Sequence, residues 1–425
     1  MLRSKVYQFL RRSERFVQTD LVYLVKQGSW LFVNTVGVTL IGLVTSYLYA
    51  NFLTKEQYGE YRYIFSIFTA LNAFSLTGIN VAVTQAVAKG KEGALLQSIP
   101  LQLKWNIFFC AAFIVTGLYY FWQGNTVFAI SLLALSCLGP VANIANTYGA
   151  FLQGKKNFQA VSVIGLLTSF MVLLSVALVL FLRTNVVVLV IANIGTLALA
   201  QTAAFFWTLR KYKPNKVQDE GLQTFSKRIS LLTAFSLIVS QIDNILVFNL
   251  LGAASVSILS FVTIIPDQLR GFVKIVGQLA LPKFAVNETA ESRQQAAKNS
   301  FKLAVVVMCV SIVYIVVAPL LFRLLFPAYQ SWVGYTRLYA LSMAFSVYQI
   351  PLSLLYAHRY EERITRVTLI ITIGSLVISC ISVPLFGLIG VVVGRMVAQA
   401  FNLAISSYYV WIKPPIPESL SKGQS

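Results

Sequence analysis

Long apolar runs recur along the whole chain, and short polar stretches separate them. Each run is about 20 residues long, the length that a helix needs to cross roughly 30 Å of hydrocarbon. The twelve runs cover residues 28–52, 63–87, 104–122, 126–150, 160–182, 186–207, 229–251, 256–281, 303–326, 334–357, 366–384 and 387–411. The pattern therefore predicts an all-α, polytopic membrane protein with about 12 transmembrane helices.

Composition agrees with this interpretation. Of the 425 residues, 57% are hydrophobic and only 11% are charged, and the mean hydropathy is +0.73. A soluble fold would have to bury every one of these helices with almost no polar faces on them. We therefore exclude a soluble globular protein.

The positive charges predict how the chain is oriented in the membrane. The net charge is +20, and 26 of the 34 Lys and Arg residues fall in segments on one side of the predicted spans. Cytoplasmic loops carry such an excess, so both termini are expected in the cytoplasm. Basic loops beside an anionic leaflet explain most of the charge, and no nucleic-acid motif competes with this explanation.

Weak internal similarity predicts two lobes. A shift of 198 residues places Asn51 on Asn249 and Lys104 on Lys302. Six spans per half give both halves the same orientation, which is a parallel repeat. The predicted domains are an interfacial or solvated N-terminal segment (1–27), an N-lobe (28–209), a cytoplasmic linker (210–228), a C-lobe (229–411) and a cytoplasmic tail (412–425). Two six-helix lobes would surround a central cavity.

The eighth predicted span carries charges in its middle. Asp267, Arg270 and Lys274 are spaced i, i+3, i+7, which places them on one face of a helix. Each such charge costs roughly 2.5–3.5 kcal/mol on insertion scales, so charges inside a membrane usually face a water-filled cavity or one another. Pro266 removes a backbone hydrogen bond just before them and favours a bent or locally opened helix.

Two interpretations of these charges stay open. In the first, Arg270 and Lys274 line a cationic cavity for an anionic headgroup, and Arg62 and Arg337 extend it outward. In the second, Arg270 and Lys274 only neutralise Asp267 and Asp243 between helices. Asp243 would then be a permanent ion-pair partner, whereas in the first interpretation it is a candidate for proton or Na⁺ coupling. Arg395 lies in the last span, and its direction is open.

Neutral polar residues also occur within the first two spans. They are Asn34, Asn72, Asn80 and Gln85. Amide side chains of this kind bind sugar hydroxyls, and they also join membrane helices to one another. No metal site is expected, because the only histidine is His358 and the cysteines lack paired spacing.

Several stretches resemble a known family. NFLTKEQYGEY, residues 51–61, resembles the first outer loop of the polysaccharide-transport (Wzx-type, O-antigen and capsule oligosaccharide) flippases. Gly78 with residues 88–92 resembles the end of that family's second span, residues 241–244 its seventh span, and residues 324–329 the loop after its ninth. Residues 252–255 depart from the pattern, because they lack the usual acidic residue and late tyrosine.

The resemblance implies a flippase of the multidrug/oligosaccharidyl-lipid/polysaccharide (MOP) exporter superfamily. Such a protein moves polyprenyl-pyrophosphate-linked oligosaccharide across the bacterial cytoplasmic membrane by alternating access. Its expected partners are that lipid, membrane lipids and other polysaccharide-assembly proteins, and no cofactor is expected. Two alternatives are a drug or metabolite antiporter of the same superfamily and a membrane enzyme of glycan assembly. The enzyme is disfavoured, because Glu56 and Glu60 are the only carboxylates predicted on the external side.

Overall fold

The computed structural model describes residues 21–182, 185–286, 290–348, 351 and 361–412. This described part is almost entirely helical, and it contains no strand. Contacts between residues divide the chain into two units, residues 1–257 and residues 258–425. The predicted lobes, 28–209 and 229–411, divide the chain before α10, whereas the contact units divide it after α10. The two lobes stay a prediction.

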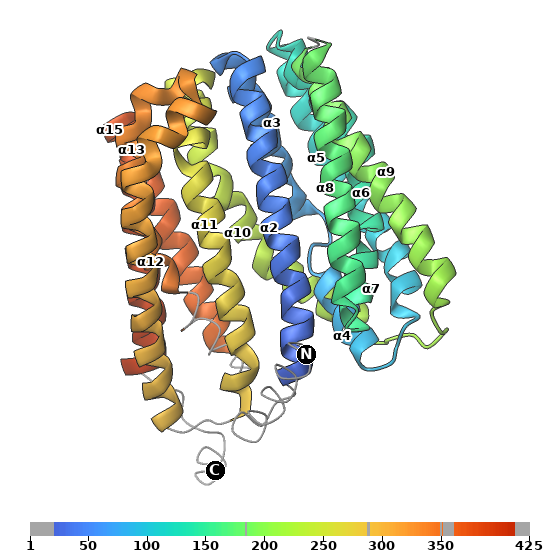
Figure 1. The fold of residues 1–425 in the computed structure, drawn as a ribbon. Coiled ribbons are helices and arrows are strands. Elements are labelled where there is room, and N and C mark those ends of the chain that lie inside the picture. Colours follow the sequence, from blue (N-terminus) through green and yellow to red (C-terminus); the bar gives the residue numbers. More distant parts are fainter. Residues whose placement is uncertain (1–20, 183–184, 287–289, 349–350, 352–360, 413–425) are drawn as a thin grey trace, which may run out of the picture. The chain divides into compact units, whose positions relative to one another are not determined.

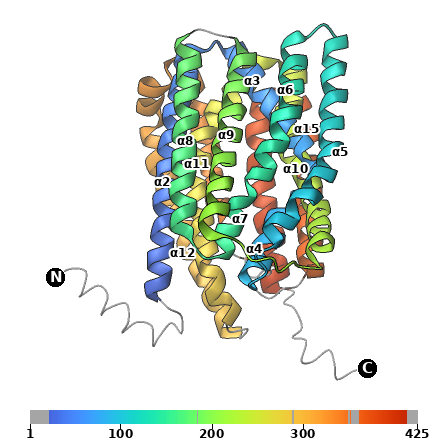
Figure 2. The same cartoon turned by 90° about the vertical axis from the view of Figure 1, so that its right-hand side faces the viewer.

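The first unit is a bundle of long helices with two short ones (Figures 1 and 2). Its elements are α2 (Leu21–Phe52), α3 (Lys55–Leu71), η1 (Asn72–Phe74), α4 (Ile79–Ala88), α5 (Ala94–Trp122), α6 (Thr126–Ala145), α7 (Thr147–Gly154), α8 (Phe158–Phe181), α9 (Val186–Tyr212), α10 (Leu222–Leu251) and the start of α11 (Ala253–Val286). α2 packs on α8, α6 on α5 and α9, and α10 on α3 and α4.

Polar side chains at the helix ends explain where the helices begin. Thr54 and Gln57 form a capping box at α3, in which each side chain accepts a hydrogen bond from the other residue's backbone N–H. Asn125, Asn157 and Asn185 cap α6, α8 and α9 in the same way, because each side-chain oxygen accepts from a backbone N–H three residues later. These caps satisfy N–H groups that have no partner within the helix.

The predicted span at 63–87 is broken rather than straight. α3 and η1 are followed by α4 at an angle of 58°. At the break, the Ser75 hydroxyl donates to the Asn72 carbonyl at 2.7 Å and to the Asn72 side-chain oxygen at 2.8 Å. Local bonds of this kind compete with the helix, so hydropathy predicted the span and missed the break.

Two glycines of the family-like motifs allow α10 and the start of α11 to approach α3 and α4 closely. A Cβ atom on Gly59 would lie 1.9 Å from the Ala253 carbonyl oxygen, and one on Gly78 would lie 2.5 Å from that of Ser226. The Gly78 N–H also donates to the Ser230 hydroxyl at 2.9 Å. A side chain at either position would push the helices apart.

The second unit contains the rest of α11 and the C-terminal helices. They are α12 (Ala290–Leu325), η2 (Pro327–Trp332), α13 (Val333–Leu341), η3 (Ser342–Tyr348), α15 (Glu361–Ser407) and η4 (Tyr408–Ile412). α11 is continuous through Pro266, so the expected opening of the helix is not seen. α15 is two helices joined at Gly387, whose φ of 59° and ψ of −136° are not helical. This kink falls at the boundary predicted between 366–384 and 387–411.

Within the described residues, eight helices are long and apolar enough to cross a membrane, or nine if the bent pair is one span. Each of the twelve predicted ranges falls at least partly on a helix, and α15 contains two of them. The range 334–357 extends into residues outside the described part. The all-α class and the multi-pass membrane architecture are therefore confirmed.

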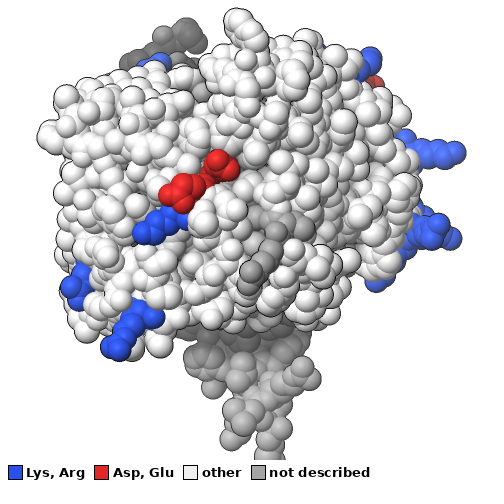
Figure 3. All heavy atoms as spheres, turned by 90° about the horizontal axis from the view of Figure 1, so that it is seen from above, with Lys and Arg blue, Asp and Glu red and all other residues white. Residues whose placement is uncertain are grey.

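The basic loops of the first unit lie at one end of its helices. The loops at 89–93, 155–157 and 213–221 contact one another there, and they carry Lys89, Lys91, Lys155, Lys156, Lys213 and Lys216. The opposite end, seen in Figure 3, has a mostly uncharged surface. This asymmetry follows the predicted charge bias, and the cytoplasmic position of the basic end stays a prediction.

Candidate functional site

Arg270 lies about halfway along α11, and hydrogen bonds hold its guanidinium group. Nη1 donates to the Asp267 carboxylate at 2.9 Å and to the Tyr339 hydroxyl at 2.6 Å. Nη2 donates to the Ser342 hydroxyl. Tyr339 in turn donates to Asp267 at 2.9 Å, and its ring centroid lies 4.4 Å from the guanidinium carbon. We call Asp267, Arg270, Tyr339, Ser342 and Gln399 the arginine cluster.

Gln399 brings a third helix, α15, into the arginine cluster. In the amide orientation that satisfies its neighbours, the side-chain oxygen accepts from Arg270 Nη1 at 2.7 Å, and the nitrogen donates to the Ser342 carbonyl at 2.9 Å. Arg395 lies one turn earlier on α15 and is close enough to Tyr339 to act on it electrostatically. The cluster and Arg395 together hold two cations and one carboxylate.

The two charged groups of the ion pair differ in exposure. The Arg270 side chain is 12% exposed and that of Asp267 is 47% exposed. Arg270 Nε is buried and has no hydrogen-bond partner among the described residues. Asp267 is thus the partner at the accessible edge of the cluster, and Arg270 is the group that the protein holds in place.

The structure brings together only some of the predicted site residues. Asp267 and Arg270 form the expected pair within α11. Arg337 is exposed on α13, and its Nε donates to the Ile315 carbonyl of α12 at 3.0 Å, so it is not part of the arginine cluster. Arg62 belongs to the first unit, on α3, where it acts electrostatically on Tyr58 and Tyr61. The side chain of Lys274 lies outside the described residues.

Asp243, the predicted coupling residue, is buried in α10 with 9% of its surface exposed. Its neighbour Asn244 donates to the Ser66 hydroxyl of α3 at 3.0 Å. This face of α10 therefore packs against α3 within the first unit. The roles proposed for Asp243, in coupling or in an ion pair with Arg270, stay predictions.

The first unit contains a second polar region, a cavity of about 140 Å³ at the break between α3 and α4. We call it the amide cavity. Its polar lining comes from η1, α4, α5 and α6 and consists of Asn72, Ser75, Thr77, Asn80, Gln102, Asn106, Asn143 and Asn146. Among the described residues, none that lines it is charged. A volume of this size has room for several waters or a small hydroxylated group.

Some of the amide groups around this cavity are paired and others are not. Asn143 donates to the Asn72 side-chain oxygen at 2.9 Å, and Gln102 donates to the Thr147 hydroxyl at 3.0 Å. Asn106 Nδ2 and Asn80 Oδ1 are buried and have no partner among the described residues. One donor and one acceptor of the lining residues are therefore left without a hydrogen-bond partner.

The sequence had indicated Asn72 and Asn80 but not the partners that complete the cavity. Gln102, Asn106, Asn143 and Asn146 come from the next two helices, where each is a polar residue in an apolar run. That isolation was the available signal. Of the other amides considered, Gln85 is exposed and Asn34 faces Gly165 on α8, so neither lines the amide cavity.

At the basic end, one ion pair joins the 213–221 linker to the α4–α5 loop, and a second joins that loop to the α7–α8 turn. Lys91 contacts Asp219 at 2.7 Å and Lys155 contacts Glu92 at 2.5 Å. These lysines hold the pKa values of Asp219 and Glu92 below their ordinary range. A Cβ atom on Gly93 would lie 2.7 Å from the Val217 carbonyl oxygen. The linker can therefore approach the α4–α5 loop this closely only because residue 93 is a glycine. We call this set of contacts the linker clasp.

Comparison with solved structures shows which proteins share this fold. An outward-facing multidrug resistance transporter of the MATE family matches with a TM-score of 0.65 at 13% identity, covering 95% of this chain and 97% of its own. An inward-facing MATE transporter gives 0.71 at 13% identity, with 91% and 96% covered. The lipid II flippase MurJ gives 0.65 at 13% identity, with 88% and 86% covered. The chain therefore has the fold of these transporters, of which the two MATE proteins are described as members of the MOP superfamily.

The sequence then identifies the family. The profile of the polysaccharide biosynthesis protein family matches residues 24–273, and the chain belongs to that family. Its fold is shared with the membrane transporters named above. Comparison with curated protein sequences gave no match.

Proposed function

We propose that this protein is a flippase that carries a polyprenyl-pyrophosphate-linked oligosaccharide across the cytoplasmic membrane for cell-surface polysaccharide synthesis. The supporting observation is the presence of two polar regions of different chemistry in an otherwise apolar chain. The amide cavity is neutral, and the arginine cluster with Arg395 has a cationic excess. A lipid-linked oligosaccharide has both a neutral glycan and an anionic pyrophosphate.

Arg270 is proposed to bind the pyrophosphate. Guanidinium groups form charge-assisted, bidentate bonds with phosphate oxygens, and the carboxylate now paired with Arg270 is nearly half exposed. A phosphate oxygen would replace Asp267 as the partner of Arg270, while Tyr339, Ser342 and Gln399 keep the guanidinium in position. Lys274 is proposed to add a second cation, and Arg62 and Arg337 would act further outward.

The amide cavity is proposed to bind a hydroxylated part of the glycan. Sugar hydroxyls both donate and accept, which matches the unpartnered Nδ2 of Asn106 and Oδ1 of Asn80. A buried polar atom without a partner is unfavourable by roughly 1–3 kcal/mol. A hydroxyl that bonds such an atom therefore gains more binding free energy than one that bonds a group already paired within the protein.

Transport would follow alternating access, in which the lobes rock so that the site opens first inward and then outward. Both termini and the basic end would be cytoplasmic. Asp243 is proposed to bind and release a proton or Na⁺ during this cycle, since a carboxylate in a membrane helix is expensive unless it has such a role.

A reconstituted assay tests the proposal. Purified protein is placed in vesicles with a fluorescent polyprenyl-pyrophosphate disaccharide, and an impermeant reductant is added outside. We expect the inner-leaflet fluorescence to become accessible only with protein present, and much more slowly when the lipid carries a single phosphate. Gradient-driven efflux of organic cations without any glycolipid movement would establish an antiporter instead.

A further inference from the structure

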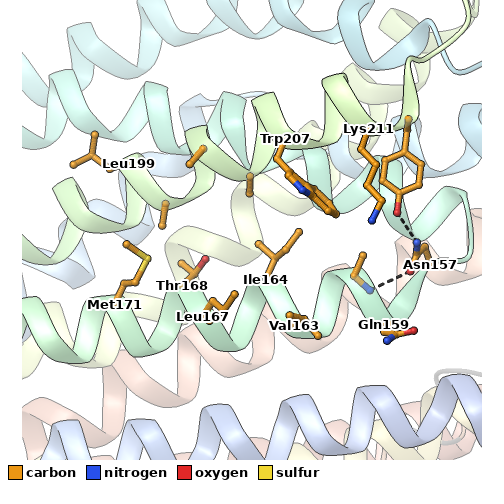
Figure 4. A pocket seen from close by; sticks show the side chains of 15 residues that line it. Asn157, Gln159, Val163, Ile164, Leu167, Thr168, Met171, Leu199, Trp207 and Lys211 are labelled. Carbon is orange, nitrogen blue, oxygen red and sulfur yellow. Dashed lines mark hydrogen bonds between the residues drawn. The ribbon is translucent and has the colours of Figure 1, made fainter.

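A groove of about 920 Å³ lies between α8 and α9 in the first unit, and it shares no lining residue with the amide cavity. Figure 4 shows its walls, which are apolar over most of their length. They include Val163, Leu167 and Met171 from α8, and Leu199, Ala203 and Trp207 from α9. Leu199, Leu167 and Met171 are all exposed, so the groove is open along its length.

The groove has one polar end. Lys211 and Asn157 lie there, as Figure 4 shows, and the Lys211 ammonium is 4.5 Å from the centroid of the Trp207 ring. Asn157 donates to the Tyr212 hydroxyl at 2.6 Å. In the part of the chain that the structure describes, no carboxylate forms an ion pair with Lys211. The site therefore offers one cation at the mouth of an apolar channel.

The length of the groove matches a single leaflet. From Leu199 to Lys211 the helix rises about 18 Å, and half of the hydrocarbon core is about 15 Å thick. A transmembrane helix of a partner protein would need a groove that continued through both leaflets. The acyl chain of a lipid in one leaflet spans only this distance, and the headgroup of that lipid would lie at the basic end.

We propose that this groove is a binding site for an anionic phospholipid, with one acyl chain along α8 and α9 and its phosphate on Lys211. Basic pockets between transmembrane helices on the cytoplasmic side bind anionic headgroups. Lys211 supplies the charge, and Trp207 supplies an amphipathic ring at the boundary between chain and headgroup. The lipid would act as a structural ligand that holds the basic ends of α8 and α9, separate from the transported substrate.

Trp207 provides a reporter for the test. The full-length protein is placed in phosphatidylcholine nanodiscs with increasing phosphatidylglycerol, and either lipid is brominated on its acyl chains to quench tryptophan fluorescence. The contribution of Trp207 is the difference between the parent protein and Trp207→Phe. We expect half-quenching at about fivefold lower mole fraction of brominated phosphatidylglycerol than of brominated phosphatidylcholine, the factor expected for one lysine near a membrane surface.

Variants separate this site from general lipid contact. Lys211→Gln should abolish the fivefold preference, whereas Lys213→Gln, two residues further along the same basic end, should keep it. Ala203→Phe should fill the groove and reduce quenching by both lipids. The proposal fails if both lipids quench equally or if Lys211→Gln keeps the preference. It also fails if trace polyprenyl phosphate relieves the quenching, because the occupant would then be a carrier lipid.

Discussion

The arginine cluster and the amide cavity solve the problem of polarity inside a membrane in opposite ways. In the cluster, side chains of α11, α13, η3 and α15 bind Arg270, and only its Nε lacks a partner among the described residues. In the cavity, the groups are neutral, and at least two amide atoms stay unpartnered. A charge left alone in low dielectric is far more costly than a neutral amide, which agrees with the larger number of hydrogen bonds made by Arg270.

This difference assigns different tasks to the two regions. A ligand of the arginine cluster must exchange with Asp267, so binding there replaces one ionic partner by another. A ligand of the amide cavity adds bonds that the protein lacks on its own. In the proposed function, the cluster would therefore recognise the phosphate and the cavity would select among sugars.

The largest expected effect comes from Arg270. Arg270→Ala should lower flipping by at least about a hundredfold, because it removes two charge-assisted bonds of roughly 1.5–3 kcal/mol each to the phosphate. Arg270→Lys should retain part of the activity, since an ammonium cannot bind two oxygens in a fork. Flipping in vesicles and protein yield in membranes are measured together.

A double variant distinguishes substrate binding from simple neutralisation of charge. If Arg270 only balances Asp267, then Asp267→Asn combined with Arg270→Gln restores what either change alone removes. If Arg270 binds pyrophosphate, the double variant folds normally and stays inactive. Normal flipping by Arg270→Ala at full protein yield would end the phosphate proposal.

Tyr339→Phe should have the next largest effect. The Tyr339 hydroxyl accepts from Arg270 and donates to Asp267, so its loss frees the guanidinium to move without changing the charge. We expect flipping to fall about tenfold, in line with one hydrogen bond to a charged group. Tyr314→Phe is the matched control, because Tyr314 bonds the Thr336 hydroxyl at 2.7 Å outside the cluster. It should lower thermal stability but leave flipping unchanged.

Asn106→Leu tests the amide cavity with a smaller expected effect. Asn106 Nδ2 has no partner among the described residues, so its removal should leave thermal stability equal or higher. Flipping of the preferred glycan should fall about two- to tenfold, the range of one neutral hydrogen bond. Asn143→Leu should instead lower thermal stability, because it breaks the hydrogen bond to Asn72. Equal flipping of lipids with and without the glycan would argue against a sugar site.

Hydropathy was sufficient to predict the helices, and helical spacing predicted the pairing of Asp267 with Arg270. Both depend on residues close together in the sequence. Tyr339, Ser342 and Gln399 were missed, because they reach Arg270 from other helices and look ordinary in their own segments. Gln102, Asn106 and Asn143 do stand out as polar residues in apolar runs, but nothing in the sequence shows that they meet in one cavity. The break at Asn72 depends on local side-chain hydrogen bonds, and the mean hydropathy of a window of about 20 residues does not detect them.

The smallest expected effect is on the stability of the linker clasp. Its charged groups lie in water, unlike the charged groups of the arginine cluster. Partly exposed ion pairs contribute under about 1 kcal/mol each. Because Lys155 and Lys91 lower the pKa values of Glu92 and Asp219, the folded form binds fewer protons than the unfolded one. The stabilisation is therefore fully present at neutral pH and is lost as the pH falls below about 4, through the folded pKa values.

Hydrogen exchange at the backbone amides of Asn215 and Asp219 measures this effect directly, because these amides donate to the Glu92 and Gln97 side chains. After correction for intrinsic rates, protection should be constant from pH 8 to about pH 5 and should fall below about pH 4. Asp219→Asn should reduce protection at pH 7 by less than about fivefold, and Lys216→Gln, outside both ion pairs, should not. If acid leaves protection unchanged, the hydrogen bonds and the close contact at Gly93 hold the linker without help from the charges.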